Sequence, residues 1–205
     1  MDERSHGHIE VIAGGMFSGK SEELVRRLKR AVLARQRVQV FQPTIDTRHS
    51  KERLVTRDGR QLRAESVDDS AQLRAKLQLG TQVVGIDEAQ FFDDELPQVV
   101  VELANAGLRV IIAGLDMDFR GRPFGPMPQL MAVAEYVDKV HAICIRCGKP
   151  AGFSQRIAGG DDQVQVGDAE SYEARCRRCY EPTAADETAT STDEAPVVIA
   201  GPRAI

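Results

Sequence analysis

The chain has 205 residues, with 27 lysines and arginines against 31 aspartates and glutamates, and a formal net charge of −4. This length suits one main domain with a small addition and is enough to bury a substantial core. The acidic balance disfavours binding to a long phosphate backbone, which depends on clustered positive charge. No apolar stretch approaches the ~20 residues that cross a bilayer, and the polar start lacks the apolar segment of an export signal. We therefore expect a soluble, cytoplasmic protein.

Apolar patterning predicts strands that alternate with helices along the chain. The expected strands are 9–13, 38–41, 83–86, 108–114 and 136–145, and the expected helices are 21–37, 70–79, 97–106 and 129–135. The segment 44–67 has no clear period and predicts a long loop with room for a hairpin. Such alternation is typical of a parallel α/β sheet covered by helices on both faces, with functional residues at the carboxyl ends of its strands.

A glycine-rich motif stands between the first predicted strand and the first predicted helix. It matches the pattern G-x-x-x-x-G-K-[ST] in full and comprises Gly14, Gly15, Met16, Phe17, Ser18, Gly19, Lys20 and Ser21. In such a loop, backbone N–H groups surround phosphate oxygens, the lysine reaches the β and γ oxygens, and the serine hydroxyl binds Mg²⁺. The motif therefore predicts an ATP and Mg²⁺ site on a P-loop NTPase sheet. A glycine-rich turn with an exposed lysine is the alternative.

Two adjacent acids end the predicted strand 83–86. Asp87 has the position of a Walker B carboxylate, which holds Mg²⁺ opposite the serine of the phosphate loop. Glu88 follows at once and projects in another direction, so it can serve as a general base, worth ~10²–10⁴ in rate. A surface charge or a helix-start acid is the alternative interpretation of Glu88.

Four cysteines form two C-x-x-C pairs, Cys144 with Cys147 and Cys176 with Cys179. Disulfides are disfavoured in a reducing compartment, whereas two such pairs offer four thiolates to a tetrahedral Zn²⁺. The segment between the pairs exceeds the usual ~15–20 residues, which suggests a loop closed at its base by the metal. Four buried, unpaired cysteines are the alternative. The predicted organisation is an ATP-binding domain at 1–140, a zinc-ribbon-like domain with a substrate loop at 141–182, and a disordered acidic tail at 183–205.

Several motifs together resemble the type II thymidine kinases. They are residues 16–21, Asp46-Thr47-Arg48, the run Asp-Glu-Ala-Gln-Phe-Phe at 87–92, Arg-Pro-Phe-Gly at 122–125, and the stretch 167–180 around the second cysteine pair. The resemblance implies a homotetrameric enzyme of nucleotide salvage that transfers the γ-phosphate of Mg·ATP to the 5′-hydroxyl of thymidine, and of deoxyuridine, without nucleic-acid or membrane partners.

The resemblance also implies roles for individual residues. Glu88 would accept the proton of the 5′-hydroxyl, and Arg48 would stabilise charge on the transferred phosphoryl group. Asp46, Asp87 and Gln90 would lie on the nucleotide and metal side. The nucleoside would contact Met16, Phe91, Leu115, Phe119, Gln163, Val164, Gln165, Val166, Gly167 and Tyr172. For Met16, Phe91 and Leu115, plain core packing is the alternative.

Three other functions compete with the nucleoside kinase. A P-loop ATPase with a zinc ribbon that acts on nucleic acid would carry a basic stripe, which the net charge argues against. A nucleotide-dependent regulatory module without catalysis would need Asp87 and Ser21 but not Glu88. A kinase for another nucleoside, such as deoxycytidine, differs only in its base pocket.

Overall fold

The computed structural model describes residues 7–44, 54–55, 61–158 and 171–182. The predicted residues Asp46 and Arg48, the predicted loop residues 163–167 and the tail 183–205 lie outside the described residues. Within the described part of the chain, no helix combines the length and the apolar character needed to cross a bilayer.

Six parallel strands form the main sheet, which confirms the predicted α/β class. Its order is β5-β2-β6-β7-β1-β8. The strands are β1 (His8–Ala13), β2 (Val38–Pro43), β5 (Ala64–Val67), β6 (Val83–Ile86), β7 (Arg109–Gly114) and β8 (Tyr136–Lys139). Because β7 lies between β1 and β6, the segments that follow these three strands emerge side by side at one edge of the sheet.

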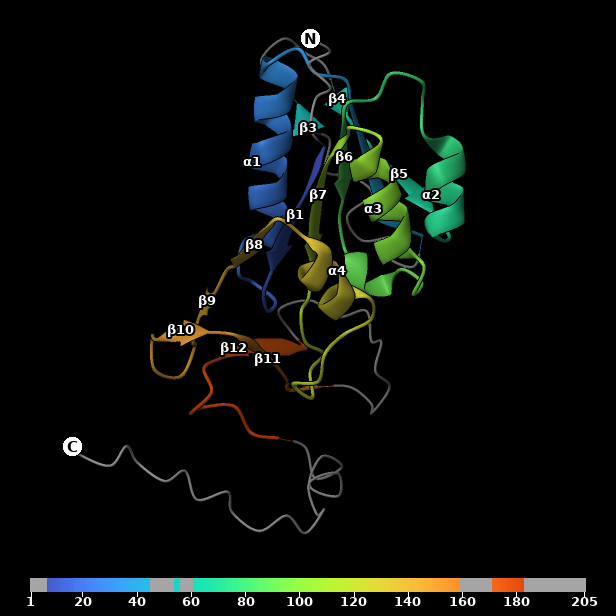
Figure 1. The fold of residues 1–205 in the computed structure, drawn as a ribbon. Helices are drawn as coiled ribbons and strands as arrows, with labels where there is room; N and C mark the ends of the chain where they lie inside the picture. Colours follow the sequence, from blue (N-terminus) through green and yellow to red (C-terminus); the bar gives the residue numbers. More distant parts are fainter. Residues whose placement is uncertain (1–6, 45–53, 56–60, 159–170, 183–205) are drawn as a thin grey trace, which may run out of the picture.

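Helices cover both faces of this sheet. In Figure 1, α1 (Lys20–Leu33) lies on one face, and α2 (Ser70–Lys76), α3 (Leu96–Asn105) and α4 (Met127–Val133) lie on the other. The alternation of side chains along β1 serves both layers: Ile9 and Val11 pack in the core with α2, α3 and α4, and Ile12 packs against α1. Apolar burial on both faces explains why the central strands are almost continuously hydrophobic.

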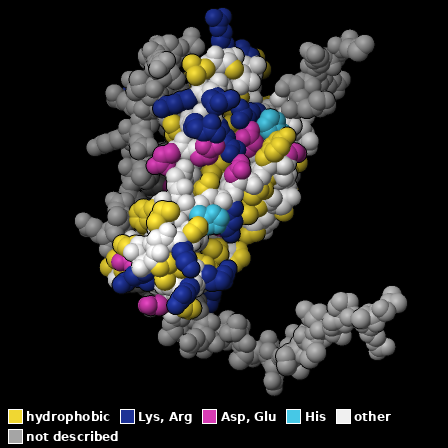
Figure 2. Space-filling model, turned by 90° about the vertical axis from the view of Figure 1, so that its left-hand side faces the viewer, with side chains coloured by type: hydrophobic (Ala, Val, Ile, Leu, Met, Phe, Trp, Pro, Cys, Tyr) yellow, Lys and Arg dark blue, Asp and Glu magenta, His cyan; other side chains and the backbone are white. Residues whose placement is uncertain are grey.

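One buried acid interrupts the apolar face under α1. Glu10 of β1 is 7% exposed, and its carboxylate accepts from Arg109 Nε (2.6 Å) and Arg27 Nη1 (2.7 Å). Arg27 of α1 also bonds Asp138 of β8 at 2.7 Å. These ion pairs join the helix to three strands. Figure 2 shows this side of the molecule, where basic and acidic side chains are interspersed on the surface.

A smaller unit of paired strands lies beyond the carboxyl edge of the sheet (Figure 1). It pairs β9 (Ala142–Ile143) with β10 (Pro150–Ala151) and β11 (Phe153–Arg156) with β12 (Tyr172–Arg175), both antiparallel. Its central apolar cluster consists of small residues, alanines and cysteines: Ala142, Cys144, Ala151, Ala174 and Cys176. We call residues 142–182 the cysteine lobe.

The structure corrects three predicted elements. The first helix ends at Leu33, because Arg35 adopts a left-handed conformation (φ 60°). The segment 44–67 contains the hairpin for which the prediction left room, β3 (Leu54–Val55) with β4 (Gln61–Leu62), but it also contains an unpredicted edge strand, β5. β5 reads Ala-Glu-Ser-Val, so its half-exposed edge position left no apolar pattern to detect. The expected strand 136–145 divides into β8 of the sheet and β9 of the cysteine lobe.

Candidate active site

The phosphate loop follows β1 directly and leads into α1. Gly14 has φ 155°, and a Cβ there would overlap the carbonyl oxygen of Val140. Only glycine therefore fits where the loop leaves the sheet. Phe17 is a non-glycine residue in the left-handed region (φ 64°), a strained conformation of the kind that collects at ligand sites.

Lys20 closes the phosphate loop on itself. Its Nζ donates to the carbonyl oxygen of Gly15 at 2.8 Å, and the residue is 8% exposed. Burial lowers the pKa of Lys20, and the negative charges of Glu88, Asp87 and Asp116 oppose that effect. A buried ammonium surrounded by three carboxylates is suited to an anionic ligand that brings its own counter-cation, such as a nucleotide with Mg²⁺.

Asp87 faces the first turn of α1 from the end of β6. Ser21 Oγ donates to Asp87 Oδ1 at 3.2 Å, so the serine and the carboxylate of the two predicted motifs meet across the sheet edge. Burial, reinforced by the charge of Glu88, raises the pKa of Asp87 to about 7. A divalent cation would relieve this crowding of negative charge, so Ser21 and Asp87 fit the Mg²⁺ predicted for them.

Glu88 begins a turn of 3-10 helix, η1 (Ala89–Phe91). Its backbone is left-handed (φ 51°), an uncommon conformation for a residue other than glycine. The carboxylate is half-buried, and its Oε2 accepts a 2.6 Å hydrogen bond from Gln90 Nε2. An acid beside the phosphate loop, in contact with solvent, can take a proton from an incoming hydroxyl.

A third acid at this edge, Asp116, was missed from the sequence. It follows β7, is 6% exposed, and its Oδ2 lies 2.7 Å from Nζ of Lys139 at the end of β8. Its Oδ1 has no hydrogen-bond partner among the described residues. Asp116 comes two residues after the end of a buried strand, so the rule that indicated Asp87 could also have indicated Asp116.

The described members of the predicted base pocket divide into two kinds. Met16, Phe91 and Leu115 are half-buried, whereas Phe119 and Tyr172 are 5% and 7% exposed. Their partial exposure leaves Met16, Phe91 and Leu115 accessible to a ligand, although Phe91 also packs edge to face against Phe124.

Arg156 of β11, which sequence reasoning also missed, links the two buried aromatic residues. Its guanidinium carbon lies 3.6 Å from the centroid of the Phe119 ring, and its Nη2 donates to the Tyr172 hydroxyl at 2.7 Å. A cation stacked on one ring and bonded to a second holds both in defined positions.

The cysteine lobe contacts the phosphate loop and the segment after β7. The backbone N–H of Met16 donates to Ser154 Oγ at 2.9 Å, and the Tyr180 hydroxyl donates to the carbonyl oxygen of Phe119 at 2.8 Å. Phe153 stacks on Tyr180 with ring centroids 4.5 Å apart. The lobe is thus joined to the nucleotide side of the site by specific contacts.

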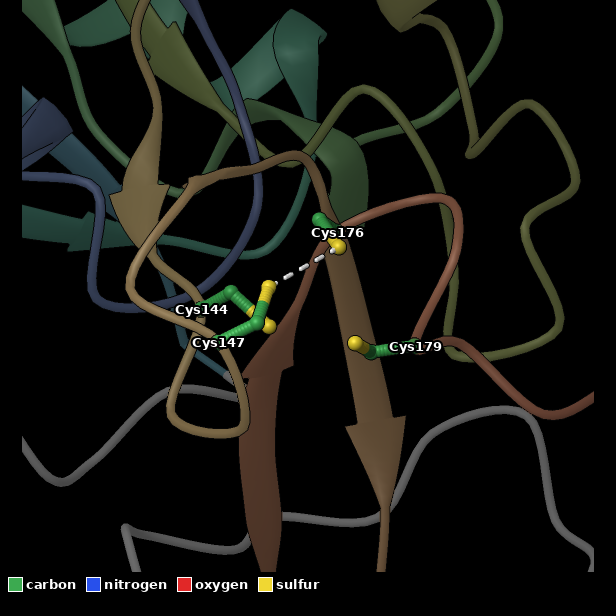
Figure 3. A group of neighbouring side chains, drawn as sticks. All are labelled: Cys144, Cys147, Cys176 and Cys179. Carbon is green, nitrogen blue, oxygen red and sulfur yellow. Dashed lines mark hydrogen bonds between the residues drawn. The ribbon is translucent and has the colours of Figure 1, made fainter.

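The four cysteines converge on one point, as their spacing predicts. Their sulfur atoms all lie within 4.8 Å of one another, and Sγ of Cys147 is 3.5 Å from Sγ of Cys176 (Figure 3). Burial raises the pKa of Cys144, but backbone N–H groups more than offset it and bring the pKa to about 6. Four sulfurs around Zn²⁺ at ~2.3 Å would lie about 3.8 Å apart, so the cluster fits that ion.

Comparison with known proteins agrees with this geometry. A model of the family described as thymidine kinase matches residues 7–180. This chain belongs to the thymidine kinase family. The thymidine kinase of Bacteroides thetaiotaomicron is 57% identical over 177 residues, which cover 86% of this chain and 88% of that relative. The thymidine kinase of Bacteroides fragilis strain NCTC 9343 is 55% identical over 178 residues, 87% of this chain and 89% of that relative.

The family match spans the main sheet, the phosphate loop and both cysteine pairs. Among solved structures, the flagellar accessory protein FlaH from Methanocaldococcus jannaschii superimposes with a TM-score of 0.48 at 13% identity, over 77% of this chain and 75% of that one. A likeness at that level supports no inference about function.

Proposed function

We propose that this chain transfers the γ-phosphate of ATP to the 5′-hydroxyl of thymidine, yielding thymidine monophosphate and ADP. The observation that carries the proposal is the meeting of Ser21, Asp87 and Glu88 at one sheet edge, in a chain of the thymidine kinase family. The rival ATPase acting on nucleic acid finds no comparable support, since the net charge is −4 and the relatives are thymidine kinases.

The residues divide the chemistry between them. Glu88 accepts the proton of the 5′-hydroxyl as that oxygen bonds to the γ-phosphorus, and the bond from the γ-phosphorus to the bridging oxygen of ADP breaks. When ATP binds, the Lys20 ammonium exchanges its contact with the Gly15 carbonyl for contacts with phosphate oxygens. Its positive charge then stabilises the negative charge on those oxygens. Arg48 and Asp46 would complete the phosphoryl side; both stay predictions.

Two metals have residues suited to them. Ser21 and Asp87 would hold the Mg²⁺ that accompanies ATP and neutralises charge on the phosphates. Cys144, Cys147, Cys176 and Cys179 would hold a structural Zn²⁺ at the base of the substrate loop. The two sets of ligands have no residue in common.

The nucleoside would bind between the cysteine lobe and the segment after β7. Phe119 and Tyr172, held by Arg156, would enclose the base together with Met16 and Leu115. The main chain at 163–167 would complete this pocket, as the family resemblance implies. A homotetramer in the cytoplasm remains the expected state of the enzyme.

The direct test is an assay of monophosphate formation. Purified protein is incubated with Mg·ATP and each deoxynucleoside in turn, and we expect thymidine and deoxyuridine to be phosphorylated. Glu88→Gln should retain ATP binding and lower kcat at least about 100-fold, because it removes the proton acceptor. If thymidine stays untouched while DNA stimulates ATP hydrolysis, the proposal is wrong.

A further inference from the structure

Gln90 is the most deeply buried polar residue beside the proposed proton acceptor, at 2% exposure. It lies in η1, two residues after Glu88. Its Nε2 donates to Glu88 Oε2 at 2.6 Å, and its Oε1 accepts from the backbone N–H of Leu115 at 2.9 Å. One side-chain amide therefore joins the end of β6 to the end of β7.

The orientation of this amide is determined by its neighbours. The Leu115 N–H can only donate, so the amide oxygen must face it and the amide nitrogen must face Glu88. Close packing holds the residue in place: Gly125 is left-handed (φ 48°), and a Cβ there would overlap the carbonyl oxygen of Gln90. A buried amide with one possible orientation is a rigid donor.

Glu88 depends on such a donor. Its backbone is in the left-handed region, which residues other than glycine adopt only with strain, and its half-buried side chain would otherwise have several rotamers. The hydrogen bond from Gln90 occupies Oε2 and leaves Oε1 for a substrate hydroxyl. A misplacement of about 1 Å in such a group can cost ~10²-fold in rate.

We propose that Gln90 is a positioning residue that holds the Glu88 carboxylate in its reactive orientation and ties it to Leu115 of the base pocket. This inference rests on the proposed kinase function. It gives Gln90 a role different from the nucleotide and metal side implied by the family resemblance. Base pocket and proton acceptor then form one rigid unit, so a bound nucleoside meets a carboxylate that is already oriented.

Two substitutions test the role. Gln90→Glu keeps the volume and the acceptor for Leu115 N–H but replaces the donor to Glu88 by a carboxylate. We expect kcat to fall about 10–100-fold, with KM for thymidine and for ATP within about threefold of wild type. Gln90→Met, which cannot donate either, should lower kcat to a similar extent with the same KM values.

A double-mutant cycle separates positioning from a general structural effect. In a Glu88→Gln background, Gln90→Glu should change kcat less than twofold, because a positioning residue has nothing left to position. Two results would overturn the inference: an equal loss of kcat in both backgrounds, or a kcat equal to that of the wild type in both Gln90 variants. Neither result affects the proposed kinase function as long as the wild-type protein phosphorylates thymidine. If the wild type does not phosphorylate thymidine, both proposals fail. ATP binding by each variant establishes that it is folded.

Discussion

The main sheet and the cysteine lobe are held together by different forces. The sheet buries large apolar side chains on both faces, among them Phe41, Leu28 and Ile112. The central apolar cluster of the lobe consists of alanines and cysteines, and Ile143 and Ile145 are 68% and 64% exposed. Hydrophobic burial therefore stabilises the sheet, whereas the lobe has little apolar core and would be stabilised by the Zn²⁺ proposed at its four sulfurs.

This difference matches the two proposed tasks, which are phosphate binding by the sheet edge and nucleoside binding by the lobe. Phosphate binding needs backbone groups fixed in advance, and the phosphate loop follows a strand of a sheet that is packed on both faces by its own apolar core. The lobe carries Arg156 and Tyr172 on a single pair of short strands, joined to the phosphate loop through Ser154. A small unit closed by a metal can present these side chains to the nucleoside with little core of its own.

Removing the metal should have the largest effect. Binding of a structural Zn²⁺ can contribute ~10–16 kcal/mol to folding, so chelation or Cys147→Ser should unfold the lobe alone. We expect amide exchange in β11 and β12 to become fast while β1, β6 and β7 stay protected, and thymidine binding to be lost. Zinc added back to the chelated wild type is the control. Equal loss of protection in β1 would show that the two regions form one cooperative unit.

Neutralising Glu10 should destabilise the sheet in a pH-dependent way. Burial raises the pKa of Glu10, but Arg109, Arg27 and His8 outweigh burial and bring it below the ordinary 4.5. Its ionised form therefore stabilises the fold above about pH 4.5, and this contribution is lost as the pH falls further.

We expect Glu10→Gln to lower the free energy of unfolding by about 2–3 kcal/mol at pH 7, and by less at pH 3.5. The difference in the free energy of unfolding is measured by urea unfolding of the metal-free wild type and variant, in which we expect the lobe to be already unfolded. Asp138→Asn removes a half-exposed partner of Arg27 and is the matched control, with an expected cost of about 1 kcal/mol or less. A Glu10→Gln effect as small as that of the control would contradict the prediction.

The smallest predicted effect concerns the contact between the two regions. Ser154→Ala leaves the Met16 N–H without its acceptor, at a cost of about 1 kcal/mol. Because Met16 belongs to the phosphate loop, ATP affinity should fall about three- to tenfold in calorimetric titration. Ser154→Thr retains the hydroxyl and should bind ATP as the wild type does. Unchanged affinity in Ser154→Ala would show that the lobe does not act on the nucleotide site.

Local patterns predicted the parts of the site that are contiguous in sequence. The phosphate loop, the acids after β6 and the two cysteine pairs each occupy a few neighbouring residues whose chemistry does not depend on distant partners. The strand β5 was missed because it is short and half-exposed, and its side chains show no apolar alternation. Its extended conformation is stabilised by backbone pairing with β2.

Residues that act through distant partners could not be found in this way. Ser154 is 138 positions from Met16, and Arg156 contacts Phe119 across the boundary between the sheet and the lobe. No spacing in the sequence signals such pairs. The family resemblance implies that Gln90 lies on the nucleotide and metal side, and the position of the Leu115 N–H shows which way its amide points.

The sequence by itself determined three features: a phosphate-binding loop motif, two acids at the end of a strand, and two cysteine pairs spaced for one metal site. Each of these features depends on the backbone conformation and side-chain chemistry of only a few residues. Tertiary structure alone decided that β7 separates the two motif strands, that Gln90 bonds Glu88, and that the lobe joins the phosphate loop. The reason is physical: hydrogen bonds and ion pairs form between groups that folding brings together, and strand order is set by packing across the whole sheet.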